Sequence, residues 1–500
     1  MASFFKLYTP EGFLTFSSVS LLIFNSFIIN NTKFKYPLLN FEIFFQIFTI
    51  GIITLLLLLN VSFVNINYNF FFFNTFSTQN LKILLMFVFL NTFILIWRNF
   101  YIQKLNFFEY FIILLITLVG LFFLINSYNL ISIYLCLEIQ ALGFYILASF
   151  DRASIFSSEA GLKYFISSSL ISGIFLLGSA LIYGSFGTIN LFEICFLTQF
   201  FSDYYINFSY FSFIFGSFLI LNTLLFKLVI APFHFWFPQI YDGAPLSSTI
   251  TFSIIPKIAL INLFINFWSS IINILSFFNT FFFLIGLYSV FFGIFKMLKQ
   301  KRLKKLYIYS SISNFGLLLC ILIDNSLDSI FSIYFFLIIY IITALLLWII
   351  FTIVYYNQTL QLSNTQPLHY SIFLTSFNTL FIQNKLFAIS ICFIFFSLAA
   401  IPPFCGFLSK LYLFIILLKS HKYEFSIILI YLGIFGSYYY IKFLKIVCFE
   451  NIILNKQIQI KNLYFIPFFN IESTLYSFYI FLLIYLFINP HALLSFILLI

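Results

Sequence analysis

The chain has 500 residues, of which 63% are hydrophobic and only 8% are charged, and its mean hydropathy is +1.10. Soluble globular domains carry about 25% charged residues, so this composition excludes a soluble enzyme. A helix that crosses a bilayer needs roughly 20 apolar residues, and such runs follow one another along the chain. The 82 Phe against 17 Gly indicate A+T-rich codons, which are typical of an organellar genome.

Apolar runs separated by short polar breaks predict an all-α, polytopic membrane protein of about fourteen transmembrane helices. The run 386–418 is too long for a straight span, and Pro402 and Pro403 at its middle predict a broken helix. The predicted spans are residues 12–30, 41–64, 82–97, 107–125, 129–150, 162–184, 208–230, 248–268, 271–295, 306–323, 329–356, 386–418, 425–447 and 474–499.

The basic residues are divided unequally between the two sides of these predicted spans. Seventeen Lys and Arg fall in the loops after odd-numbered spans, and four fall on the other side. By the positive-inside rule the first side is the matrix or the cytoplasm, and both termini lie opposite. The net charge of +10 is therefore a topology signal and not a nucleic-acid-binding surface. The run Lys296–Lys305 is most simply an anchor at the lipid headgroups, with a specific lipid or partner site as the alternative. The four basic residues on the side opposite the Lys-rich loops are Lys6, Lys82, Lys419 and Lys422.

Four charged residues remain inside apolar segments: Glu138, Lys227, Lys257 and Lys410. A charge at the centre of a bilayer costs at least about 2.5–3.5 kcal/mol, so such residues normally face a polar interior and carry function. Each also has a structural interpretation. Glu138 is either a functional acid or a hydrogen-bonded structural one, and Lys227 either lies at a helix break before Pro232 or extends to the interface.

The two other lysines follow helix-breaking residues. Lys257 comes directly after Pro256, which removes a helical hydrogen bond and frees a carbonyl, so the ammonium either relays protons or satisfies that carbonyl. Lys410 follows AAIPPFCGFLSK, in which Pro402, Pro403 and Gly406 are expected to break the helix and to open a small wet cavity.

Proton carriage is the chemistry that such residues favour. Burial lowers the pKa of a lysine and a nearby carboxylate raises it again, so movement of the partner loads or releases a proton. His234, in the break after Lys227, is either an accessory relay residue or an interfacial ring. The six cysteines have no metal-ligand spacing, and we expect them to be inert packing residues and the chain to hold no metal.

Four stretches of the sequence resemble one known family. They are YLCLEIQALGFYILASFDRASIFSSEAGLKYFISSSLISGIFLLGSALIYGSFGTIN, LLFKLVIAPFHFWFPQIYDGAPLSSTITFSIIPKIAL, KRLKKLYIYSSISNFGLLL and FFSLAAIPPFCGFLSKLYLF. These stretches resemble subunit 2 of mitochondrial NADH:ubiquinone oxidoreductase, respiratory complex I, which corresponds to bacterial subunit N. The likeness is collinear from about Asn129 to Phe414. Antiporter-like complex I subunits and multisubunit cation/proton antiporters form the wider family.

The resemblance implies a fold with two inverted five-helix repeats, each holding one discontinuous helix. It also assigns roles to the four buried charges as a proton relay: Glu138 matches the family's acid, Lys227 and Lys257 match its lysines in the first repeat, and Lys410 matches the lysine that favours subunit 2. Two features depart from the family pattern, namely Asn314, where relatives often have histidine, and the Phe-rich N-terminal third. The implied segments are 1–125, N-terminal helices; 126–268 and 269–447, the repeat regions; and 448–500, the last loop and helix.

Function, cofactors and partners follow from the resemblance as expectations. The chain would be a proton-translocating membrane-arm subunit of complex I in the mitochondrial inner membrane, with other membrane-arm subunits and lipid as partners. It shows no nucleotide-binding or cluster-binding motif, so NADH, FMN, iron–sulfur clusters and ubiquinone would be bound by other subunits. The alternatives are a component of a cation/proton antiporter, and a structural spacer whose buried charges only fix packing.

Overall fold

The computed structural model describes residues 9–31, 38–60, 71–103, 108–151, 154–200, 208–271, 276–322, 326–361, 377, 384–449 and 470–491. These residues are almost entirely helical and form no β-strand beyond two isolated bridges. The helices are α1 (Pro10–Asn31), α2 (Leu38–Asn60), α3 (Phe76–Gln103), α4 (Phe108–Asn126), α5 (Leu130–Ala148), α6 (Ile155–Phe186), α7 (Leu191–Phe200), α8 (Phe208–Leu228), α9 (Trp236–Gly243), α10 (Leu246–Ile271), α11 (Ser276–Met297), α12 (Leu303–Ile321), α13 (Leu327–Gln361), α15 (Lys385–Ala399), α16 (Cys405–Lys419), α17 (Tyr423–Cys448) and α18 (Asn470–Ile488).

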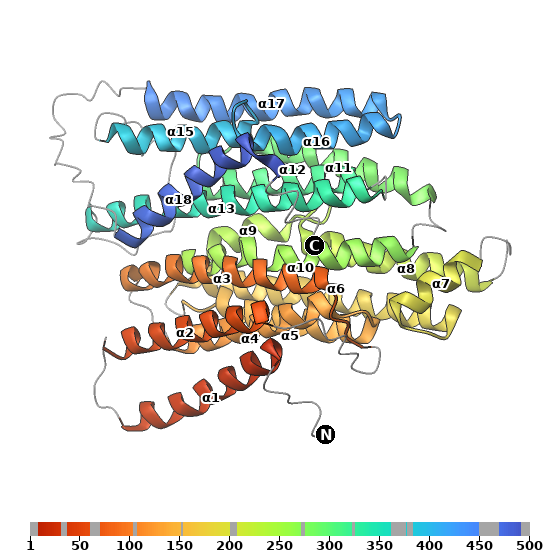
Figure 1. Cartoon of the computed structure of the whole chain (residues 1–500), viewed down its shortest axis with the longest axis horizontal. Helices are drawn as coiled ribbons and strands as arrows, with labels where there is room; N and C mark the ends of the chain where they lie inside the picture. The colour runs from red at the N-terminus through yellow and green to blue at the C-terminus, as the bar shows by residue number, and fades with distance from the viewer. Residues whose placement is uncertain are drawn as a thin grey trace. The chain divides into compact units, whose positions relative to one another are not determined.

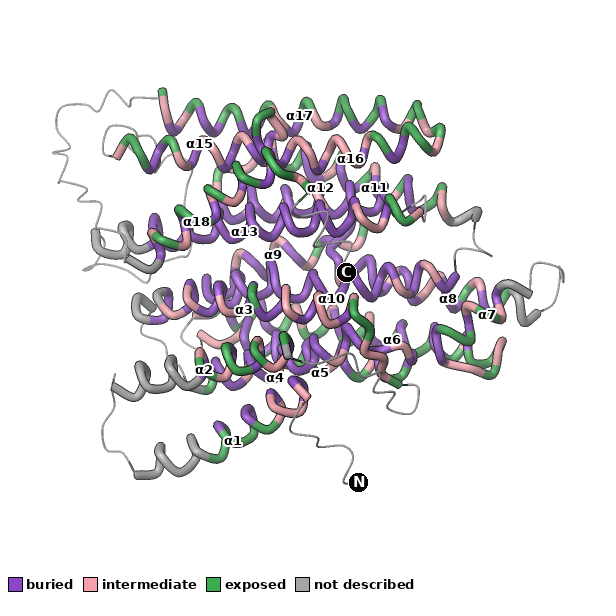
Figure 2. The backbone as a smooth tube through the Cα atoms, in the orientation of Figure 1, coloured by how far each residue is buried: buried purple, intermediate pink, exposed green. Residues whose placement is uncertain are grey.

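The chain forms two compact units, whose described residues lie within Met1–Leu228 and Gly243–Ser276 for the first unit and within Val229–Asp242 and Phe277–Leu498 for the second. In the first unit α5 packs against α4 and α6, α6 packs against α8, and α10 packs against α3, α4, α7 and α8 (Figure 1). Burial is nearly complete along α10, so this helix forms the centre of its unit (Figure 2).

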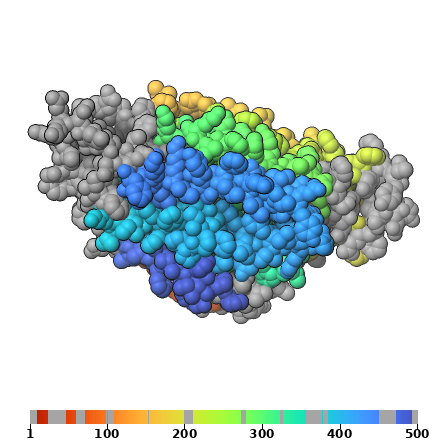
Figure 3. All heavy atoms as spheres, turned by 90° about the horizontal axis from the view of Figure 1, so that it is seen from above, coloured from red at the N-terminus to blue at the C-terminus, as the bar shows by residue number. Residues whose placement is uncertain are grey.

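The second unit has α13 at its centre, packed against α15, α16 and α18. In Figure 2 α13 is buried along most of its described length beyond its first turns, because neighbouring helices enclose it. α17 lies alongside α15 and α16, and the atoms of these three helices form one continuous face in Figure 3. α13 is thus the apolar core against which the two halves of the broken helix pack.

Glycines permit close helix crossings in both units. A Cβ on Gly178 of α6 would lie 2.8 Å from the carbonyl oxygen of Gly216 on α8, and the reverse distance is also 2.8 Å. In the second unit a Cβ on Gly316 of α12 would lie 2.8 Å from the carbonyl oxygen of Gly286 on α11. Because a backbone carbonyl cannot move aside as a side chain does, these two crossings require glycine.

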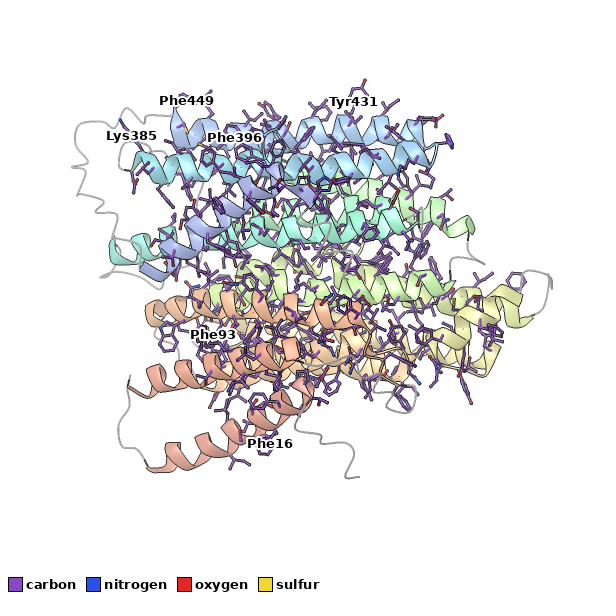
Figure 4. All side chains as sticks on the ribbon, viewed as in Figure 1. Phe16, Phe93, Lys385, Phe396, Tyr431 and Phe449 are labelled. Atoms are coloured by element: carbon purple, nitrogen blue, oxygen red, sulfur yellow. The ribbon has the colours of Figure 1, made fainter. Side chains whose placement is uncertain are left out.

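Large apolar side chains project outward from the outer helices. Figure 4 shows Phe16 on α1, and Tyr431 on α17, pointing away from the packed helices, and their exposed fractions are 57% and 62%. Phe93 on α3, by contrast, is fully buried. An outer surface of this kind is unstable in water but is well solvated by lipid, so the burial pattern fits a membrane-embedded protein.

The structure confirms the predicted all-α, polytopic membrane fold. Nine helices of the described residues are long and apolar enough to span a bilayer, and four shorter apolar helices accompany them. The predicted run 386–418 is indeed broken, into α15 and α16. Two helices differ from the predicted spans: the ten-residue α7 lies in a segment expected to be a loop, and α9 stands apart after the break that follows α8.

Candidate functional site

Lys257 lies near the middle of α10 and is only 4% exposed. The helix continues through Pro256, whose nitrogen carries no hydrogen for the carbonyl of Phe252 one turn earlier. Pro256 therefore removes one hydrogen bond from α10 without ending the helix. The part of α10 before the lysine carries five buried hydroxyl groups, those of Ser247, Ser248, Thr249, Thr251 and Ser253.

Glu138 on α5 and Lys227 on α8 lie in the first unit and interact electrostatically. The Oε1 atom of Glu138 is enclosed and accepts no hydrogen bond from any residue that the structure describes. The same carboxylate interacts electrostatically with Tyr145 on α5, whose hydroxyl accepts a hydrogen bond from Ser168 on α6. An acid with one enclosed oxygen thus interacts electrostatically with a lysine on α8 and with a tyrosine whose hydroxyl is hydrogen-bonded to α6.

A break in the helix follows Lys227 directly. α8 ends at Leu228, and Val229 has a φ of 66°, in the left-handed region that β-branched residues rarely adopt. The chain leaves the helix there and resumes as α9 at Trp236. The break predicted from Pro232 is therefore present, and Lys227 stands at the end of the first half-helix.

His234 lies within this break, and its side chain is buried with a 3% exposed fraction. Its ring centroid is 4.1 Å from that of Phe292 on α11, in the same unit. The Nδ1 atom is enclosed and makes no hydrogen bond with any described residue. The structure thus places His234 inside the protein, with one ring nitrogen available for hydrogen bonding.

The second break separates α15 from α16. Ala400, with a φ of 59°, ends α15, and its N–H donates to the carbonyl of Phe396. Gly406 was expected to take part in the break, and this expectation is wrong because Gly406 is the second residue of α16. A Cβ on Gly406 would lie 1.7 Å from the carbonyl oxygen of Ser397, so glycine permits the two half-helices to approach closely.

Lys410 is half-buried on α16, four residues after Gly406 and therefore on the same face of the helix. It forms no ion pair with any other residue in the described part of the chain. α16 packs against α13 and α12, so the ammonium belongs to the second unit, whereas Glu138 and the two other relay lysines belong to the first.

The structure corrects the interpretation of the basic run Lys296–Lys305. Lys304, expected to lie at the lipid headgroups, is 1% exposed on α12 and interacts electrostatically with Asp242 of α9. Arg302 donates to Asp242 at 2.9 Å between Nη1 and Oδ2, and the Lys305 ammonium lies 3.1 Å from the same oxygen. Part of this run therefore ties α9 to α12 instead of facing lipid.

Lys82, which was counted with the loop residues although the predicted span 82–97 begins at it, is the second basic residue that sequence reasoning misplaced. It lies on α3 and forms an ion pair with Glu11 on α1, and the side chains are 3% and 9% exposed. α3 begins six residues before Lys82, but the apolar run begins only after it. The apolar pattern therefore did not show that Lys82 lies within the helix. The sequence did contain a signal for this ion pair. Glu11 and Lys82 stand at the starts of two predicted spans that begin on the same side of the membrane, where an acid and a lysine can meet.

Two thiols that are far apart in the sequence lie close together. The Sγ atoms of Cys392 on α15 and Cys448 on α17 are 3.4 Å apart in the second unit. Both are free thiols. Among the residues that the structure describes, no group of three His, Cys, Asp or Glu is arranged to hold a metal ion.

The fold and its buried charges define an antiporter-like, polytopic membrane protein. Residues 127–436 match the family model described as NADH:quinone oxidoreductase/Mrp antiporter, TM, and the chain belongs to this family.

Two relatives show the extent of the sequence likeness. The chain is 31% identical to NADH-ubiquinone oxidoreductase chain 2 of Marchantia polymorpha over 88% of both chains, and 32% identical to NADH-quinone oxidoreductase subunit N of Pelagibacter ubique over 70% of both. Among solved structures, a chain of respiratory complex I from Thermus thermophilus with bound aureothin has a TM-score of 0.73 at 21% identity, over 97% of this chain and 98% of that one. A chain of the Mrp complex from Dietzia has a TM-score of 0.75 at 14% identity, over 98% and 96%. These two structural likenesses establish the fold.

Proposed function

We propose that this chain is a proton-translocating membrane-arm subunit of NADH:ubiquinone oxidoreductase. The observation that carries the proposal is Lys257, an ammonium 4% exposed near the middle of a spanning helix in a chain of the NADH:quinone oxidoreductase/Mrp antiporter family. A buried charge in such a place is expensive and marks an ion or proton pathway. The names of the relatives that cover most of the chain favour the NADH-linked enzyme.

The proton relay consists of Glu138, Lys227 and Lys257 in the first unit and Lys410 in the second, with His234 as an accessory. Glu138 and Lys227 interact electrostatically, so movement of the Glu138 carboxylate changes the proton affinity of Lys227. Lys227 lies at a helix break, where backbone groups without helical partners are available to bind water, and Lys410 lies in the second turn of the helix that follows the other break. The roles of these residues follow from their chemistry and from their match to the family's motif.

The rest of the enzyme would supply the redox chemistry. Other subunits would bind NADH, FMN, iron–sulfur clusters and ubiquinone, and this chain would hold no cofactor. Its partners would be neighbouring membrane-arm subunits and lipid, with no nucleic acid. The A+T-rich composition and the plant relatives support the mitochondrial inner membrane, with the Lys-rich loops toward the matrix. The termini, expected on the intermembrane side, lie outside the described residues. The four-segment division at residues 125, 268 and 447 stays a prediction.

A component of a cation/proton antiporter is the alternative, because the matching family model includes Mrp antiporters. Purification from native membranes in mild detergent separates the two functions. Co-migration of the chain with an assembly that oxidises NADH with quinone supports our proposal. Cation/proton exchange by an assembly without NADH oxidation would replace the proposal with the antiporter function.

A further inference from the structure

A buried acid–lysine ion pair lies outside the proposed relay, at one end of the first unit. Glu11 in the first turn of α1 pairs with Lys82 on α3. Two amides complete the cluster: the Lys82 ammonium donates to Oδ1 of Asn74 at 3.1 Å, and the amide of Asn126 donates to Glu11 Oε1 at 3.3 Å. The Oδ1 atom of Asn126 is enclosed and accepts no hydrogen bond from the described residues, so the cluster retains one available acceptor.

Burial of this pair needs an explanation beyond packing. An ion pair removed from water gains little stability over apolar residues of the same shape, because desolvation offsets the attraction. Glu11 and Lys82 join α1 to α3, which apolar contacts would achieve at lower cost. A buried acid and lysine that share hydrogen bonds are, however, suited to proton transfer, since the ion pair and the neutral pair differ little in energy at low dielectric.

Polar side chains connect this cluster to α10, the helix that carries Lys257. Five residues beyond the lysine, the amide of Asn262 donates to the carbonyl of Ile125 at 3.4 Å, and Ile125 directly precedes Asn126 of the cluster. One turn later, the side chain of Asn266 lies beside the Tyr128 hydroxyl. All these residues belong to the first unit. The second half of α10 therefore presents amides to the end of α4, and α4 presents an amide to the ion pair.

The charge distribution assigns this end of the unit to one side of the membrane. Glu11 and Lys82 lie near the N-terminal ends of α1 and α3, and Asn126 ends α4. In the proposed topology these ends face the intermembrane side, opposite the Lys-rich loops. A proton that has reached Lys257 would therefore meet the cluster on its way out.

We propose that Glu11 and Lys82 form a proton-transfer site that releases protons from the first unit on the intermembrane side. This proposal rests on the proposed function. The Lys82 ammonium gives one proton to the Glu11 carboxylate, which leaves a neutral amine and a neutral carboxylic acid. The acid then loses that proton to water at the intermembrane end, and the amine accepts the next proton delivered from the Asn262 side, which restores the ion pair. One proton enters and one leaves in each cycle.

The test compares proton pumping per NADH oxidised in assembled complexes at matched content. In the double variant Glu11→Gln/Lys82→Met no unpaired buried charge remains, so a purely structural pair would be replaced without loss once the complex has assembled. We expect this variant to oxidise NADH but to move fewer protons per NADH. The control is Glu159→Gln/Lys163→Met, which removes the exposed ion pair of α6 and should leave the ratio unchanged.

Two further variants make every outcome decisive. Lys82→Arg keeps the charge and the pairing but cannot release its proton, so it should also lower the ratio, and it decides the matter if the double variant does not assemble. Lys257→Met reports on the proposed function itself. A normal ratio in the Glu11 and Lys82 variants together with a lowered ratio in Lys257→Met would overturn this inference alone. A normal ratio in Lys257→Met as well would overturn the proposed function.

Discussion

The contact between Gly406 and Ser397 sets the distance between the two halves of the broken helix. Gly406→Ala would place a Cβ 1.7 Å from the carbonyl oxygen of Ser397, whereas real Cβ contacts are essentially never shorter than 3.0 Å. The start of α16 must then separate from the end of α15 by at least about 1.3 Å, because a backbone carbonyl has no rotamer that relieves the overlap. Lys410 lies one turn further along α16 and moves with it.

The energetic cost follows from the nature of this obstacle. Overpacking a buried site typically costs about 1–3 kcal/mol, and contact with backbone places this substitution at the upper end of that range. About 3 kcal/mol changes the ratio of intact to disrupted packing more than a hundred-fold. We therefore expect Gly406→Ala to lower both the yield of assembled complex and its proton pumping.

The assay is native electrophoresis of detergent-solubilised membranes, followed by thermal inactivation of NADH:quinone activity in the assembled fraction. Gly433→Ala is the matched control, because a Cβ there meets nothing within 4 Å and alanine favours the helical conformation of α17. Assembly and thermal stability of Gly406→Ala equal to those of the unmodified complex would refute the close approach of α15 and α16.

Three further predictions address the site and its surroundings. Lys410→Met removes the titratable group, so it should leave the complex assembled and lower proton pumping at least about ten-fold. Lys410→Arg should impair pumping too, because the guanidinium keeps its proton. Normal coupled pumping in vesicles by the assembled Lys410→Met complex would show that Lys410 is not on the proton path. Lys301, exposed in the Lys-rich loop, should escape a lysine reagent admitted only to the intermembrane side of mitoplasts, and its modification there would reverse the topology. Copper-phenanthroline oxidation should join Cys392 to Cys448, since their sulfurs are 3.4 Å apart; a peptide map in which both thiols stay free would contradict the packing of α15 on α17.

Local sequence signals predicted those features that depend on neighbouring residues in the chain. Pro402 and Pro403 cannot continue a helix, and the break lies at these residues. Lys257 stands between long apolar segments, so no conformation of its side chain reaches the interface, and the structure buries it. The break after Lys227 was likewise indicated by Pro232.

Features that depend on distant residues could not be predicted in this way. Lys82 and Lys304 lie within a turn or two of a helix start, where a lysine usually faces water. The charge count along the sequence therefore assigned both to loops. Their burial depends on Glu11, 71 residues before Lys82, and on Asp242 of α9. Gly406 was misread for a related reason, because only the folded chain brings the Ser397 carbonyl against it.

The glycine-lined helix crossings have a consequence for the gene. Glycine codons begin with two guanines, so the A+T-rich codon usage that the composition indicates disfavours glycine, and this chain has 17. Gly178 and Gly216 lie where α6 meets α8, and Gly286 and Gly316 lie where α11 meets α12, at sites where a methyl group would meet a carbonyl oxygen. At these crossings there is no room for a methyl group, so a codon bias against glycine conflicts with the packing of the helices.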